Sequence, residues 1–226
     1  MSTPQVLIHQ ITFLRHAQSI ANQGRIVQGQ QNSLLSDLGI QQAQALGKYW
    51  TSEGITFDHI VCSPLQRARM TVELAIDKNI EIELDEQWKE RNYGNAEGMD
   101  YETFRHTLNA NSDRSPYTPV FETGESDWDL YLRASSAIQK ILRRPCGHYL
   151  VVTHGGILNA ALHSILGLSP STSGGRSIMR TSNTGSAHVR YNQTWMVLSL
   201  NDTRHLASKF FTPTKNKANK EMNALK

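Results

Sequence analysis

The sequence is poor in cysteine and has no long apolar run, and both shortages restrict what the protein can be. Its 226 residues include two cysteines, Cys62 and Cys146, which are too few for a disulfide framework and show no metal-ligand spacing. The N-terminal stretch lacks a basic region and is interrupted by polar residues, so it fits neither a secretion signal nor a membrane span. We therefore expect a cytoplasmic protein with reduced thiols and no membrane partner.

An excess of charge of one sign is also missing. The 23 Lys and Arg residues exceed the 20 Asp and Glu residues only slightly, for a formal net charge of +3 at pH 7. Part of this excess lies in the C-terminal stretch. Proteins that bind nucleic acid usually carry a dense basic stripe. The sequence therefore predicts no nucleic-acid partner, and it leaves the oligomeric state open.

What the chain does have is an alternation of short β-branched runs with amphipathic helical stretches. This pattern is typical of an α/β fold with a mainly parallel central sheet covered by helices on both faces. The expected strands lie at 10–15, 60–62, 80–87, at the start of 148–168, at 185–192 and at 194–201.

Serines mark three of the expected helix starts. Ser36 and Ser126 each precede a stretch whose apolar residues recur at helical spacing. Ser63 is followed by Pro64 and Gln66, an arrangement that fits a capping box with proline in the first helical turn. The strand before Ser63 is therefore expected to pass directly into a helix.

Composition also suggests how the chain is divided. We expect a single domain over 1–212, with an inserted cap or substrate loop at 99–124, because that stretch is polar, irregular and contains Pro116 and Pro119. Residues 213–226 are rich in Lys and Asn and poor in apolar side chains. They are expected to form a flexible tail.

Four basic or imidazole side chains occupy equivalent places in this pattern. Arg15 and His16 follow the first strand, Arg67 lies in the helix after the second, and His154 follows the strand at 148–153. Ligands of open parallel sheets bind outside the carboxyl ends of the strands, so these groups should converge. Arginine presents a planar fork that matches phosphate oxygens. The expected ligand is therefore a phosphoryl group.

Backbone donors should add to this site. Gly155 and Gly156 open the helix after His154, and the first N–H groups of a helix have no partner within it and attract anions. We expect both N–H groups to face the bound anion.

Four motifs now stand in order along the chain: "RHA", "SPLQRA", "ERNYGNAEG" and "THGG". Together they resemble the histidine phosphatase superfamily, also called the phosphoglycerate-mutase-like family, over about residues 11–200. The residues that match positions of the family motifs are Arg15, His16, Asn22, Arg67, Glu90 and His154. One departure is Ala17, which replaces a glycine and is expected to add a methyl group near the phosphate.

The resemblance implies a mechanism in which His16 attacks phosphorus and carries the phosphoryl group, as a neutral imidazole can near pH 7. Positive and polar groups would stabilise the phosphoryl oxygens; they are Arg15, Arg67, Asn22 and His154. Glu90 would protonate the leaving oxygen and later help to activate water, although Glu86 and Glu97 lie nearby as alternatives. Neither a metal nor another cofactor is needed, as in metal-independent enzymes of the histidine acid phosphatase type.

A cysteine-based phosphatase mechanism is excluded by spacing. Such enzymes place an arginine a fixed distance after the nucleophilic cysteine, but the corresponding residue after Cys62 is Ala68. Pro64 also removes an amide donor from the loop that would cradle phosphate. Cys62 is better interpreted as a small buried side chain.

Within the family, "GNAEGM" resembles the phosphatase branch, so the predicted function is hydrolysis of a small phosphorylated metabolite. The alternatives are a mutase that returns the phosphoryl group to its substrate and a non-catalytic domain that binds a phosphorylated ligand. Several side chains are candidates for holding the rest of the substrate: Arg91, Tyr93, Arg105, Arg114 and Tyr117.

Overall fold

The fold is seen in a computed structural model. It describes residues 8–76, 80–110, 114–119, 121–170 and 178–206. The predicted tail at 213–226 lies outside these residues. No helix in the described ranges is both long and apolar enough to cross a membrane.

The centre of the molecule is a six-stranded sheet with the order β3-β2-β4-β1-β5-β6. β1, β2, β3 and β4 pair in parallel, and β5 and β6 extend the sheet antiparallel beyond β1. The sheet is thus mainly parallel in its centre, as the alternating pattern predicted. The strands are β1 His9–Arg15, β2 His59–Cys62, β3 Ile82–Leu84, β4 Gly147–Thr153, β5 Ser186–Asn192 and β6 Thr194–Asp202.

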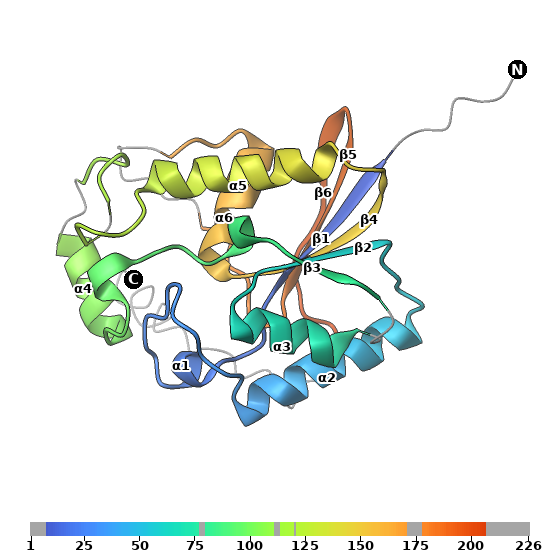
Figure 1. Ribbon diagram of the computed structural model, residues 1–226, viewed down its shortest axis with the longest axis horizontal. Coiled ribbons are helices and arrows are strands. Elements are labelled where there is room, and N and C mark those ends of the chain that lie inside the picture. Colours follow the sequence, from blue (N-terminus) through green and yellow to red (C-terminus); the bar gives the residue numbers. More distant parts are fainter. Residues whose placement is uncertain (1–7, 77–79, 111–113, 120, 171–177, 207–226) are drawn as a thin grey trace, which may run out of the picture.

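Helices cover both faces of this sheet, which confirms the predicted α/β fold. α2 and α3 lie on one face, and α5 and α6 lie on the other (Figure 1). The helices are α1 Ile20–Gln23, α2 Asp37–Ser52, α3 Gln66–Ala75, α4 Tyr101–Ala110, α5 Asp127–Leu142 and α6 Gly155–Leu166, with short 3-10 turns η1 Glu86–Trp88 and η2 Gly94–Ala96.

Alternation along β1 supplies a hydrophobic core to each face. Ile11 and Phe13 are fully buried among residues of α5 and α6, whereas Leu14 packs against residues of α2 and α3. Successive side chains of a strand point to opposite faces. Burying each large apolar side chain stabilises the fold by about 1.5–3 kcal/mol, so β1 is held firmly from both sides.

The predicted helix starts at Ser36 and Ser126 are confirmed, and both serines cap their helices. The Ser36 hydroxyl accepts a hydrogen bond from the Gly39 N–H at 3.1 Å, and Ser126 forms a capping box with Asp129. The prediction for Ser63 is wrong. α3 begins only at Gln66 and has no side-chain cap, because the Ser63 hydroxyl is engaged with the ring of a histidine in the site described below.

The predicted insertion at 99–124 is more regular than expected, since α4 lies within it. Phe104 of α4 is buried against Val27 and Ala96, which explains why a polar stretch still forms a packed helix. α4 lies at one end of the molecule (Figure 1). α4 is therefore anchored to the neighbouring loops through this small apolar cluster.

Candidate active site

His16 lies immediately after β1 and is almost completely buried, with 2% of its surface exposed. Its Nδ1 lies 2.7 Å from the carbonyl oxygen of Ala17. A carbonyl only accepts hydrogen bonds, so Nδ1 carries the hydrogen and Nε2 keeps its lone pair. Burial lowers the pKa of His16 well below its usual value, and the charges of Arg67 and Arg15 lower it further. His16 is therefore a neutral imidazole with an available nitrogen.

His154 lies beside His16, with 5.0 Å between the ring centroids. Arg67 Nε donates to His154 Nδ1 at 3.1 Å, which places the hydrogen of His154 on Nε2. That nitrogen lies 2.7 Å from Ser63 Oγ, to which it donates. Burial and then the charge of Arg67 lower the pKa of His154 well below its usual value. Sequence reasoning missed this role of Ser63.

Arg67 is 1% exposed, yet no carboxylate of the described residues forms an ion pair with it. Its Nη1 donates to the Gln31 carbonyl oxygen at 2.8 Å, and its Nη2 donates to that of Gly29 at 2.7 Å. Each of these nitrogens keeps a second hydrogen for a ligand. Burial lowers the pKa of Arg67 to about 10, well above neutral pH, so the group stays charged.

Arg15 is held in a similar way. Its Nη1 donates to the Thr181 carbonyl oxygen at 2.6 Å, while its buried Nε has no hydrogen-bond partner among the described residues. A buried polar atom without a partner costs free energy, so this N–H can serve a bound anion. A methyl group added to Gly155 would lie 3.6 Å from this Nε, so the start of α6 borders the guanidinium. Gly155 therefore stays a predicted phosphate contact.

Glu90 binds the N-terminus of α6. Its Oε2 accepts from the Gly156 N–H at 3.0 Å, and its Oε1 accepts from Ile157 at 3.1 Å and from Arg91 at 2.8 Å. The expectation that the Gly156 N–H faces a ligand is thus wrong, because the chain's own carboxylate occupies that donor. A methyl group on Gly156 would lie 2.5 Å from Glu90 Oε1, so glycine is required there.

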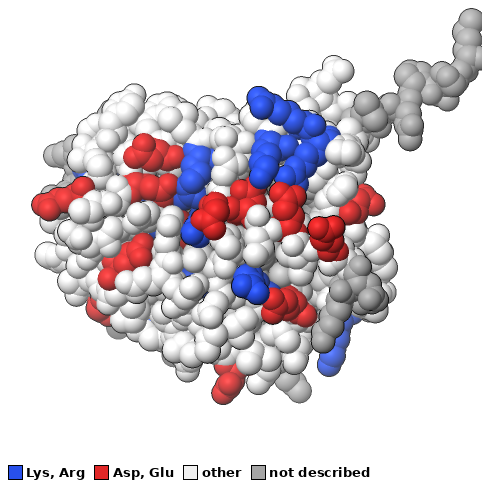
Figure 2. Space-filling view, in the orientation of Figure 1, with Lys and Arg blue, Asp and Glu red and all other residues white. Residues whose placement is uncertain are grey.

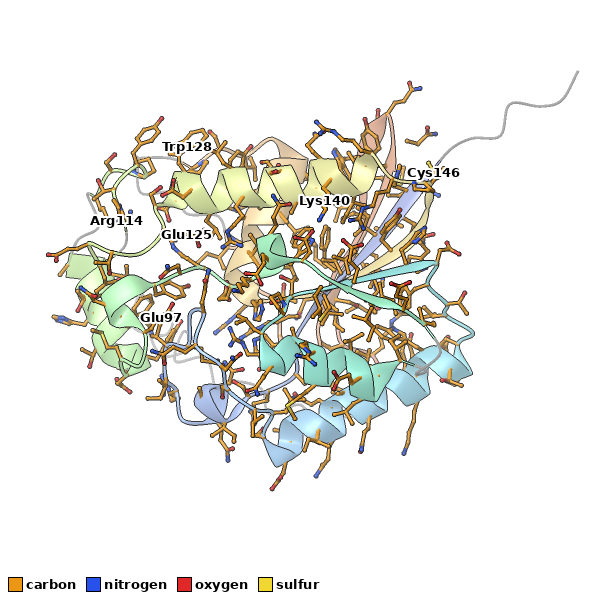
Figure 3. The ribbon with its side chains drawn as sticks, in the orientation of Figure 1. Glu97, Arg114, Glu125, Trp128, Lys140 and Cys146 are labelled. Carbon is orange, nitrogen blue, oxygen red and sulfur yellow. The ribbon has the colours of Figure 1, made fainter. Side chains whose placement is uncertain are left out.

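The two alternative acids lie in other surroundings. The side chain of Glu86 is 73% exposed and pairs with Lys89. Glu97 accepts hydrogen bonds from the N–H groups of Gln30 and Tyr93, and it lies beside the loop before α2 (Figure 3). These contacts give Glu97 a structural role and leave Glu90, which binds the start of the helix that follows His154, as the candidate acid.

A loop before β5 completes the site, and sequence reasoning missed it. Asn183 Nδ2 donates to the His16 carbonyl oxygen at 3.0 Å and to Asn22 Oδ1 at 3.2 Å. With its oxygen occupied, the Asn22 amide keeps its N–H₂ group for a ligand. The next residue, Thr184, has a φ of 55°, which is rare for a β-branched residue and typical of functional sites.

Arg91 and Tyr93, predicted to contact substrate, are engaged within the protein. Arg91 donates to Asp127 at 2.6 Å and to the Glu125 carbonyl oxygen at 2.8 Å, and it lies over the Tyr93 ring. Arg114 pairs with Asp127 as well. Arg114, Glu125 and Trp128 lie around the N-terminal end of α5 (Figure 3). Of the other candidates, Arg105 and Tyr117 are exposed.

Arg133 of α5, another residue that sequence reasoning missed, holds the segment that carries Glu90. It donates to the carbonyl oxygens of Gln87, Lys89 and Glu90 at 2.8, 2.8 and 3.2 Å and pairs with Glu125 at 2.7 Å. The backbone of Glu90 is therefore fixed from α5 while its carboxylate is fixed from α6.

The methyl group of Ala17 was expected near the phosphate, but it is buried in an apolar cluster with Leu35 and Ala43. Cys62 is buried as predicted, and burial raises the pKa of its thiol, which disfavours a thiolate nucleophile. Within the described ranges, no three His, Cys, Asp or Glu side chains group closely enough to hold a metal ion.

The site thus combines a neutral imidazole with an anchored carboxylate and with two arginines, neither of which is paired with a carboxylate in the part of the chain that the structure describes. The family model "Histidine phosphatase superfamily (branch 1)" matches residues 11–203. The chain therefore belongs to the histidine phosphatase superfamily, as its motifs suggested.

Individual relatives carry both phosphatase and mutase names. The chain is 30% identical over 212 residues to "Probable phosphoglycerate mutase GpmB" of Yersinia pestis, covering 87% of this chain and 94% of the relative. The structure of Bacillus stearothermophilus YhfR matches with a TM-score of 0.75 and 27% identity, covering 87% of this chain and 98% of that one. Phosphoserine phosphatase from Entamoeba histolytica, crystallised with 3-phosphoglyceric acid, matches with a TM-score of 0.74 and 24% identity, covering 88% of this chain and all of that one.

Proposed function

We propose that the protein is a phosphomonoester hydrolase that acts on a small phosphorylated metabolite through a phosphohistidine. The observation that carries this proposal is the tautomer of His16. Its Nδ1–H is committed to the Ala17 carbonyl, so the lone pair of Nε2 is free to attack phosphorus. A histidine that only bound phosphate by charge would need a proton on both nitrogens, and the surrounding arginines oppose that state.

In the first step, Nε2 of His16 forms a bond to phosphorus while the bond from phosphorus to the ester oxygen breaks. Arg15, Arg67, His154 and the Asn22 amide would surround the phosphoryl oxygens, and preorganised donors of this kind stabilise the charge that develops there. His154 would contribute its Nε2–H by turning from Ser63 towards the phosphoryl group.

Glu90 would supply the proton that the leaving oxygen takes up. In the second step the same carboxylate would accept a proton from water, whose oxygen attacks phosphorus while the bond to His16 breaks. Inorganic phosphate leaves, and both groups return to their starting protonation states. Three backbone N–H groups hold Glu90, so it can act in both steps without moving far.

A mutase is the second candidate, and the mutase name of the Yersinia relative favours it. Phosphoserine phosphatase and Shigella flexneri α-ribazole phosphatase are named as phosphatases, which favours hydrolysis. The two reactions share the phosphohistidine. They differ in whether water or a second substrate hydroxyl removes the phosphoryl group.

Rapid quench with a ³²P-labelled phosphomonoester tests the proposal. We expect acid-labile, base-stable label on the wild-type protein and release of inorganic phosphate, including in EDTA. His16→Ala should lose both, whereas His106→Ala, at an exposed position in α4, should keep both. Label on Cys62, or full activity of His16→Ala, would show that the proposal is wrong. With 3-phosphoglycerate, formation of 2-phosphoglycerate without free phosphate would assign the mutase reaction.

A further inference from the structure

Several residues of the stretch 178–185, which precedes β5, form hydrogen bonds to the site or to neighbouring elements. Met179 N–H donates to Asn159 Oδ1 at 2.8 Å, and the Thr181 carbonyl oxygen accepts from Arg15 at 2.6 Å. Ser182 N–H donates to Asn201 at 2.7 Å, and Asn183 bonds to the residue that carries the nucleophile. Hydrogen bonds therefore hold the chain on both sides of residue 180.

The side chain of Arg180 is exposed and forms no hydrogen bond or ion pair with the described residues. Its chain neighbour Thr181 accepts a hydrogen bond from Arg15 Nη1 at 2.6 Å, which places Arg180 beside the residue that orients Arg15. Burial lowers the pKa of Arg15, Glu90 raises it, and the charge of Arg180 lowers it again. Two cations therefore stand at one edge of the site, where repulsion would favour moving the exposed one away unless an anion binds there.

The other arginines considered for substrate binding differ in this respect. Arg91 and Arg114 share the carboxylate of Asp127, and Arg105 lies near Glu102 on exposed α4. Each of these side chains has an anion of the protein beside it. Arg180 has none among the described residues, so its charge is available to a ligand.

We propose that Arg180 binds a second anionic group of the substrate, a carboxylate or a second phosphate, while Arg15 and Arg67 hold the phosphoryl group that is transferred. This inference rests on the proposed function and narrows it to phosphomonoesters that carry another negative charge. Arg180 is next to Thr181, which orients Arg15, so the second anion lies on the Thr181 side of the phosphoryl group. Because Arg180 does not touch the reacting atoms, it acts on KM and specificity.

The test compares two substrates that differ only at the far end. 3-Phosphoglycerate carries a carboxylate where glycerol 3-phosphate carries a neutral alcohol. Arg180→Gln should raise KM for 3-phosphoglycerate roughly tenfold or more, because a charge-assisted hydrogen bond contributes about 1.5–3 kcal/mol. Glycerol 3-phosphate has no carboxylate to form this bond, so its KM should change less than about twofold. For both substrates kcat should change little.

Arg69→Gln is the matched control, since Arg69 is half-exposed on α3 and pairs weakly with Glu73 at 3.8 Å. It removes the same charge and should change neither KM. If Arg180→Gln raises KM equally for 3-phosphoglycerate and glycerol 3-phosphate, or raises it for neither, the inference is wrong. So would an equal effect of Arg69→Gln, because that result would indicate long-range attraction rather than a contact.

Calorimetric binding separates this inference from the proposed function. 3-Phosphoglycerate is titrated into His16→Ala protein with and without Arg180→Gln, so no turnover is required. Weaker binding of roughly tenfold or more in the double variant supports the subsite even if the wild-type protein proves to be no hydrolase. Equal binding by the two proteins overturns the subsite even if hydrolysis through phosphohistidine is confirmed.

Discussion

Two groups of arginines in this molecule are held by opposite means. Arg15 and Arg67, at the ends of the strands, donate to carbonyl oxygens and to an imidazole. Arg91, which follows Glu90, and Arg133 of α5 pair with carboxylates. Figure 2 shows Lys and Arg side chains interspersed with Asp and Glu side chains on the face seen there. Neutral acceptors fix a guanidinium without cancelling its charge, whereas a carboxylate fixes it and cancels the charge.

This difference separates function from stability. A buried cation without a counter-ion costs free energy in the empty protein, and an anionic ligand recovers part of that cost when it binds. An arginine already paired with a carboxylate attracts an anionic ligand less strongly, but it connects distant segments firmly. Arg133, for example, connects α5 to the turn before Glu90. The site therefore needs both kinds of arginine.

Removal of Arg67 should give the largest effect. Arg67→Gln should lower kcat/KM by about 10³ or more, because losing one preorganised donor typically costs about 10²–10³ and Arg67 also fixes the tautomer of His154. The loss should be equal for glycerol 3-phosphate and p-nitrophenyl phosphate, since both share the transferred phosphoryl group.

The opposite outcome for Arg67 is easily recognised. Activity of Arg67→Gln within about tenfold of the wild type would fall far short of the loss expected for one such donor. That result would mean that an arginine held by carbonyl oxygens and an imidazole is not thereby a functional arginine. Circular dichroism and urea unfolding of the variant distinguish a loss of chemistry from a loss of fold.

The convergence of the catalytic arginines and histidines could be predicted from the sequence. Short motifs at strand ends brought Arg15, His16, Arg67 and His154 together, because the carboxyl ends of parallel strands share one edge of the sheet. The caps at Ser36 and Ser126 were also predictable, since a cap depends on residues only three positions apart.

Long-range partners could not be predicted in this way. Ser63 and His154 are 91 positions apart, and the bond between them removes Ser63 from the helix cap that its neighbours suggested. Likewise, the Gly156 N–H has the local features of an anion site, but Glu90, 66 positions earlier, occupies it. Local patterns identify what a group can bind, and the tertiary fold decides which partner reaches it.

Glu90 should show an effect that depends on the leaving group. Glu90→Gln should slow phosphohistidine formation from glycerol 3-phosphate by about 10² or more, because an alkoxide needs protonation as it leaves. p-Nitrophenolate leaves without such help, so its burst should slow by less than about tenfold. Pre-steady-state bursts are the measurement, with Glu86→Gln at an exposed position as the control. Equal slowing of both bursts would mean that Glu90 maintains the site without delivering a proton.

Substitution of Arg91 should give the smallest kinetic effect. It tests whether an arginine paired with a carboxylate contributes to stability and not to substrate binding. Its guanidinium is held by Asp127 and by the Glu125 carbonyl oxygen, so Arg91→Gln should change kcat and KM for glycerol 3-phosphate by less than about threefold, which is under 1 kcal/mol. The free energy of unfolding of the Arg91→Gln protein should instead fall by about 1–3 kcal/mol, because the Asp127 carboxylate and the Glu125 carbonyl oxygen lose a charged donor. Arg114 still pairs with Asp127, which limits the loss. Urea unfolding and steady-state kinetics on the same preparation measure both. A tenfold rise in KM with unchanged stability would assign Arg91 to substrate binding and would show that a carboxylate-paired arginine can still serve a ligand.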